Sequence, residues 1–145
     1  MSDGPALSPD AAMVLGIAAT ALPFARTSEA EAERWLWVLR LHGEVGAVLQ
    51  GLGVGEAPLE GARPGPGSQR IGRARAEDDP IAVVTQEAVR LANRRGAETV
   101  GTGDVLVAVM RTYGDDFDLV LRAHGTDSRE VIERLASKHS VHAGS

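Results

Sequence analysis

The feature that most constrains the fold of this sequence is an internal repeat. The apolar residues around Leu39 and Leu49 recur in the same order around Met110 and Leu121, and each series ends at a glycine. A pattern repeated only once over so long a distance is not a solenoid, and it indicates one globular domain built from two copies of a helical unit. Two related halves normally pack on one another, so we expect a partner to bind at the seam between them.

Helix start signals divide both copies in the same way. Ser8-Pro9 and Asp79-Pro80 each place an N-cap residue before a first-turn proline, and Ser28 with Glu31 has the spacing of a capping box. Thr102 is expected to cap a further helix. Together with the apolar spacing, these signals predict helices that begin near residues 9, 28, 44, 80, 102, 116 and 128. No segment alternates with the period of a strand over more than a few residues, so the predicted fold is all-α, a pseudo-twofold tandem repeat of a unit of roughly four helices.

The chain is expected to form a single domain over residues 1–145. Repeat one covers about residues 7–54 and repeat two about residues 79–137, while residues 138–145 are expected to fray as a tail. Between the repeats, residues 55–78 are rich in Gly, Pro and Arg and have no apolar period, which predicts a mobile linker.

Composition excludes several functions. A net charge of −5 and an aromatic content of 3% argue against a nucleic-acid partner, which needs clustered basic residues and stacking platforms. The chain has no cysteine, and its apolar stretch at residues 11–24 is too short to span a bilayer. We therefore expect a soluble cytoplasmic protein with no membrane partner.

The second copy resembles the Clp N-terminal (Clp R) repeat, which begins the Clp/Hsp100 unfoldases. The residues that carry the resemblance are Ala88, Ala92, Gly96, Val100, Gly101, Thr102, Leu106, Val107, Val109, Met110, Val120, Leu121, Gly125 and Leu135. The first copy retains fewer of them, namely Ala11, Val14, Leu15, Leu36, Leu39, Val48, Leu49 and Gly53. The sequence contains no Gly-x-x-x-x-Gly-Lys-Ser/Thr string, so it cannot hydrolyse ATP by the chemistry of the unfoldases' AAA+ modules.

In that family the domain is a docking platform for adaptors and substrates, and in some members it binds phosphorylated arginine. The resemblance implies that such binding uses a threonine at the start of each repeat and a glutamate after the Gly-Thr turn. Here Ser8 could replace the first threonine, and Asp78 or Asp79 stands at the second. Gly103 occupies the second glutamate position, and Ala32 or Glu33 the first. Loss of the carboxylate that would pair with the guanidinium removes a strong contact, so phosphoarginine binding is not expected.

The acidic clusters are interpreted as structural. Glu29, Glu31 and Glu33 are expected to be solvated side chains that favour the start of a helix, and Asp115, Asp116 and Asp118 lack the loop of an EF-hand. We predict no metal and no cofactor.

Two tryptophans are stronger candidates for a binding role. Trp35 and Trp37 are two positions apart on a helix, so they point in nearly opposite directions and cannot both face one core. One of them is therefore expected in a groove or on the surface, where aromatic side chains often anchor partners.

Two hypotheses from different classes follow. The first is a non-catalytic module that binds a peptide, a cyclic peptide or another ligand, and acts as an adaptor or decoy for a Clp unfoldase or protease. The second is a small-molecule-binding protein or an enzyme of specialised metabolism that reuses the fold, with Asp104 or Glu33 as a buried carboxylate beside an apolar cavity. The candidate contact residues are Ser8, Glu33, Trp35, Trp37, Thr102 and Asp104.

Overall fold

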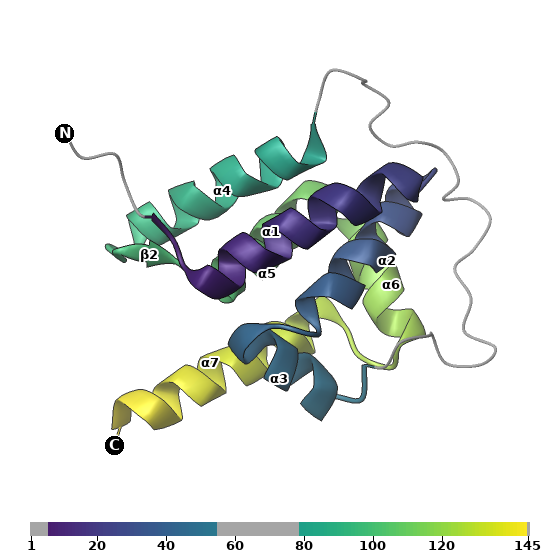
Figure 1. Cartoon of the computed structure of the whole chain (residues 1–145). Coiled ribbons are helices and arrows are strands. Elements are labelled where there is room, and N and C mark those ends of the chain that lie inside the picture. The colour runs from purple at the N-terminus through teal and green to yellow at the C-terminus, as the bar shows by residue number, and fades with distance from the viewer. Residues whose placement is uncertain (1–5, 55–78, 145) are drawn as a thin grey trace.

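A computed structural model describes residues 6–54 and 79–144 of the chain, with side chains as far as residue 137 except that of Phe24. Within these residues the protein is mostly helical, with seven α-helices, one 3-10 helix and two very short strands (Figure 1). The first part contains β1 (Ala6–Leu7), α1 (Pro9–Ala21), η1 (Leu22–Phe24), α2 (Ser28–Leu39) and α3 (Gly43–Gly51). The second contains α4 (Pro80–Arg94), β2 (Thr99–Val100), α5 (Thr102–Tyr113), α6 (Asp115–Ala123) and α7 (Ser128–Gly144).

The two predicted pairings of a cap with a proline are confirmed. The Ser8 hydroxyl accepts a hydrogen bond from the Ala11 amide at 3.1 Å, and Asp79 Oδ1 accepts one from the Ile81 amide at 3.0 Å. Each side chain satisfies an amide that the first turn of a helix leaves without an intrahelical partner. Helices α1 and α4 therefore begin where the sequence indicated.

Two other predicted caps are wrong by one residue. Thr27, with an extended backbone, caps α2 by accepting from the Ala30 amide at 3.0 Å. Ser28 is already helical, and its hydroxyl donates instead to Asp116 Oδ2 at 2.5 Å. Likewise Gly101, not Thr102, is the N-cap of α5. In both cases the neighbouring residue has the extended backbone that an N-cap requires.

The sequence predicted no strand, whereas the structure has a small parallel pair. Ala6 pairs with Thr99 and Leu7 with Val100, and the Ser8 amide continues the ladder by donating to the Val100 carbonyl at 2.9 Å. Strands of two residues are too short for an alternating pattern to reveal them. Their consequence is positional, because they hold the start of α1 beside the start of α5.

Helices from both parts of the chain share one hydrophobic cluster. Helix α1 packs on α2, α4 and α5, while α2 also packs on α5 and α6, and α3 packs on α5 and α7 (Figure 1). The largest fully buried side chains are Trp35, Phe117, Leu36, Leu39, Leu49, Leu106 and Leu121. Aliphatic side chains supply most of this core, so the helices can approach closely.

Two segments were predicted to be non-helical, and the structure describes only the second of them. The predicted linker, residues 55–78, lies outside the described residues. The predicted tail differs from the structure, because α7 continues to Gly144. No glycine or proline interrupts residues 128–142, which explains why the helix continues past residue 138.

Candidate ligand pocket

A pocket of about 350 Å³ lies among α3, α4, α5 and α7. Half of the lining residues are apolar and are called the wall here, and the other half, charged residues and glycines, are called the rim. The apolar residues are Leu91, Val107, Ile132, Leu135 and Ala136, and the others are Glu44, Arg95, Gly101, Gly103 and Asp104. A concave apolar surface with a few fixed polar groups is the usual form of a ligand site.

An ion pair between Arg95 and Asp104 forms the fixed part of the rim. Arg95 Nε donates to Asp104 Oδ1 at 3.0 Å and Nη2 donates to Oδ2, so the contact is bidentate. Asp104 Oδ2 also accepts a hydrogen bond from the Gly101 amide at 3.0 Å. The side chain of Asp104 is only 7% exposed, whereas that of Arg95 is 54% exposed. Asp104 thus joins the end of α4 to the start of α5.

The charges around Arg95 act on its pKa. The hydrogen bonds to Asp104 raise the pKa of the Arg95 guanidinium, and the negative charges of Asp104 and Glu44 act in the same direction, while burial opposes them. Arg95 is therefore a permanent cation between two carboxylates. Glu44, Arg95 and Asp104 together give the rim one net negative charge.

Gly103 keeps the entrance open beside Glu44. A Cβ atom at this position would meet only Glu44 Oε2, at 3.8 Å, which is an ordinary van der Waals contact. We expect Gly103→Ala to raise the free energy of unfolding by about 0.4–1 kcal/mol, because alanine has less freedom to lose when the chain folds. Urea unfolding followed by circular dichroism measures this change. A loss of stability would contradict the open space beside Gly103.

The structure brings three of the predicted site residues to one region. Asp104 lines the pocket. Thr102 is buried at the first position of α5, next to Gly43. Ser8 lies near Thr102, because the Ser8 amide donates a hydrogen bond to the carbonyl of Val100, two residues before Thr102. The hydroxyl of Ser8 is engaged in capping α1, which is a structural role.

The two tryptophans do point in different directions, as predicted. Trp35 is fully buried, and its Nε1 donates to the Tyr113 hydroxyl at 3.1 Å. That hydroxyl in turn donates to Glu31 Oε1 at 2.7 Å. Trp35 is thus a core residue and is withdrawn as a contact residue, because its ring does not reach the surface. Trp37 is 42% exposed and remains the candidate.

The expectation that the glutamates of α2 are solvated is wrong. Glu29 is buried at 8% exposure, Glu31 binds Tyr113, and Glu33 Oε2 lies 2.9 Å from His124 Nε2. The side chain of His124 is 1% exposed, and its Nδ1 has no hydrogen-bond partner among the described residues. Glu29 is buried and Glu31 and Glu33 are partly exposed, because the first turns of α2 pack against α5 and α6, which no local pattern indicates.

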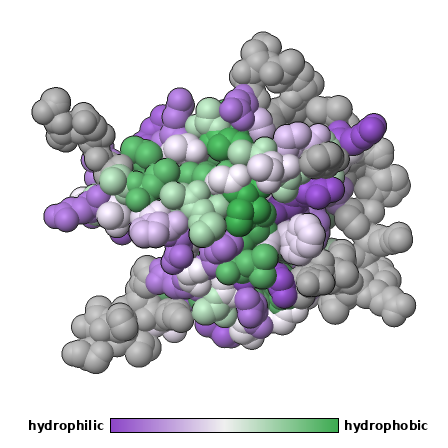
Figure 2. Space-filling model, in the orientation of Figure 1, coloured by the Kyte–Doolittle hydropathy of each residue, from purple (hydrophilic) through white to green (hydrophobic). Residues whose placement is uncertain are grey.

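The outer side of α1 is a second exposed apolar surface. Met13 is 52% exposed and Ile17 is 38% exposed, although the other side of the same helix is buried in the core. In Figure 2 hydrophobic residues gather over the face that α1 presents to the viewer. The sequence analysis did not identify this surface, although α1 contains only one charged residue, Asp10.

The sequence analysis also missed Arg95, Glu44 and the apolar wall. Arg95 lies at the C-terminal end of α4, where a positive charge favours the helix dipole whatever its other contacts. The three-residue spacing from Gly101 to Asp104 is that of an N-cap and the third helical residue, and this signal could have identified Asp104 as structural.

Among residues 6–54 and 79–137, no three side chains of His, Asp or Glu come together as metal ligands. None of the described helices combines the length and the apolar character needed to cross a bilayer.

The comparisons with known proteins provide no further identification. No protein-family model matches the chain, and neither the curated proteins nor the solved structures contain a significant match.

Proposed function

We propose that this chain is a non-catalytic binding module related to the Clp N-terminal domain, and that it holds an apolar peptide segment in the pocket beside Arg95 and Asp104. The order of its elements supports the relationship. Helices α1, α2 and α3 are followed by α4, α5 and α6, and the contacts between the two sets are reciprocal: α2 packs on α6, and α3 packs on α5. A pseudo-twofold tandem repeat has this property.

The observation that carries the proposal is the composition of the pocket. Its volume of about 350 Å³ suits one or two apolar side chains. Leu91, Val107 and Ile132 offer apolar surface, and the negative rim suits a basic residue next to the apolar one in a peptide. Glu44 comes from the first half of the chain and the other lining residues from the second, so the ligand would lie at the seam.

The polar groups of the pocket suit binding better than reaction. Asp104 accepts hydrogen bonds from Arg95 and from the Gly101 amide, which hold its position. One observation favours the second candidate, an enzyme or small-molecule-binding protein: Asp104 is buried and lies beside an apolar wall. An aspartate already committed to an arginine is better suited to orienting groups than to transferring a proton.

The peptide-binding function is tested with an array of short peptides. We expect the wild-type protein to select peptides in which Leu, Ile or Phe adjoins Lys or Arg. Ile132→Glu places a charge on the apolar wall and should weaken this binding at least about tenfold, which corresponds to about 1.4 kcal/mol.

Leu119→Glu is the matched control. Leu119 is 38% exposed on α6 and Ile132 is 39% exposed on α7, so the two substitutions introduce the same charge at equal exposure, but only Ile132 lines the pocket. Equal binding by both variants would contradict the proposal. Retention of a small molecule in native mass spectrometry, without any selection of peptides, would favour the second candidate.

The adaptor and decoy roles make opposite predictions. When the protein is added to a purified Clp unfoldase and peptidase, an adaptor accelerates the degradation of its cargo. A decoy slows degradation by competing for the ligand of the unfoldase's own N-terminal domain. If a saturating concentration of the protein does not change the rate of degradation, the proposed role in Clp proteolysis is wrong. The peptide site is then tested by the peptide array alone.

A further inference from the structure

A second cavity, of about 640 Å³, opens on the outer side of α4 and α5. Its lining differs from that of the first pocket, because cationic side chains predominate. The lining residues are Val83, Gln86, Glu87, Arg90, Arg94, Arg111 and Thr112. Consecutive helical residues point about 100° apart, and Arg94 and Arg95 accordingly line different cavities.

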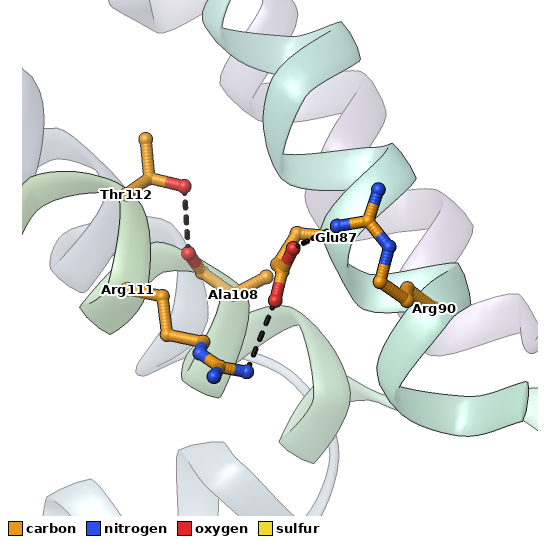
Figure 3. A network of polar contacts seen from close by, with 5 residues as sticks. All are labelled: Glu87, Arg90, Ala108, Arg111 and Thr112. Carbon is orange, nitrogen blue, oxygen red and sulfur yellow. Dashed lines mark hydrogen bonds and ion pairs between the residues drawn. The ribbon is translucent and has the colours of Figure 1, made fainter. Parts of the chain in front are cut away.

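One carboxylate holds two of the three arginines. Glu87 Oε1 lies 2.6 Å from Arg90 Nη1, and Glu87 Oε2 lies 3.1 Å from Arg111 Nη1. Figure 3 shows Glu87 between the two guanidinium groups, which approach it from α4 and from α5. Each guanidinium has five N–H donors, so most of the donors remain for another acceptor. Glu87 therefore holds together the guanidinium groups of Arg90 on α4 and Arg111 on α5.

The third arginine has no such partner. The side chain of Arg94 makes no ion pair or hydrogen bond with the described residues, and it follows Arg90 by one helical turn, where like charges repel. The ionisable groups of the cavity, three arginines and one glutamate, carry a net charge of +2. This charge stands out on a chain whose net charge is −5. A dianion in the cavity would neutralise it.

We propose that this cavity binds the phosphate group of a small phosphate monoester. Guanidinium forks match the oxygens of a phosphate and bind them in pairs. A monoester carries between one and two negative charges at neutral pH, close to the excess charge of the cavity. A cavity of about 640 Å³ is far larger than a phosphate ion, and Val83 at its edge gives the organic part of the ligand an apolar contact.

The test is a calorimetric titration at constant ionic strength. The probes are adenosine 5′-monophosphate and phenyl phosphate, with adenosine, phenol and inorganic phosphate for comparison. We expect at least one monoester to bind saturably and more tightly than inorganic phosphate, while adenosine and phenol do not bind. Absence of saturable binding by both monoesters would overturn the proposal. Inorganic phosphate binding as tightly as the monoesters would overturn the assignment to a monoester.

Variants distinguish a built site from general attraction of anions. Arg111→Gln and Arg94→Gln should each weaken binding about tenfold, the loss expected for a charge-assisted hydrogen bond. Arg94 has no partner among the described residues, so its replacement should not disturb the fold. Arg129→Gln removes the same charge from α7, where the side chain is 83% exposed and lies outside the cavity. A similar loss in Arg129→Gln would overturn the proposal.

The same titration separates this site from the peptide pocket. Ile132→Glu, which should weaken peptide binding at least about tenfold, is expected to bind the monoester as the wild type does. Loss of both activities in Ile132→Glu would indicate a common site and overturn the assignment to the outer cavity. If the array shows no selection of peptides but the monoester still binds, the peptide function is wrong and the proposed monoester site stands.

Discussion

Replacement of Trp35 by alanine is expected to lower the free energy of unfolding by about 3–5 kcal/mol, as for other buried aromatic residues. Trp35 is fully buried, so the substitution leaves a cavity in the centre of the core. It also removes the indole N–H that donates to the Tyr113 hydroxyl. For a chain of this size the loss corresponds to a decrease of about 10–15 °C in the melting temperature.

The neighbouring tryptophan provides the control. Trp37 is 42% exposed, so Trp37→Ala should cost less than about 1 kcal/mol. Both variants are compared by urea unfolding followed by far-UV circular dichroism, because tryptophan fluorescence changes with the substitution itself. A larger loss for Trp37→Ala than for Trp35→Ala would mean that the helix faces the core with its other side.

The second large effect is expected at Gly43, where two costs combine. Its φ of +66° is unfavourable for a residue with a side chain, and a Cβ atom would lie 2.8 Å from Thr102 Oγ1. Asp10 Oδ2 lies 3.3 Å from the same point. We expect Gly43→Ala to lower the free energy of unfolding by about 2–5 kcal/mol, the sum of the backbone cost and the overpacking of a close contact.

Gly96 separates the two costs. Its φ is +70°, but a Cβ atom there would have no neighbour within 4 Å, so Gly96→Ala should show the backbone cost alone, about 1–2 kcal/mol. Thr102→Ala removes both side-chain atoms that approach Gly43 most closely, and it should therefore reduce the effect of Gly43→Ala in a double-mutant cycle. Equal losses at Gly43 and Gly96, with no coupling to Thr102, would contradict the close approach of α3 to the start of α5.

Local sequence signals were sufficient for most helix boundaries. Ser8 and Asp79 cap their helices as predicted, and Pro23 lies in the 3-10 turn that follows α1. These features depend on residues within one helical turn, so the sequence displays them directly. The predicted caps at Ser28 and Thr102 failed because the residue before each, Thr27 and Gly101, has the extended backbone of the N-cap.

The candidate site was less predictable than the fold. Asp104 was identified, but its partner Arg95 and the wall residue Ile132 come from other helices. The pairing of Glu33 with His124 joins residues that are 91 positions apart. Each of these side chains, taken alone, is compatible with a solvated helix surface.

By itself, the sequence determined that this protein is mostly helical and where most of its helices begin, because capping and apolar spacing act within a few residues of the chain. Only the tertiary structure decided which tryptophan enters the core, which carboxylates find a partner and where the pockets open. These outcomes depend on the contact of one helix with another, because a buried polar group is stabilised when the helix that covers it supplies a hydrogen-bond partner.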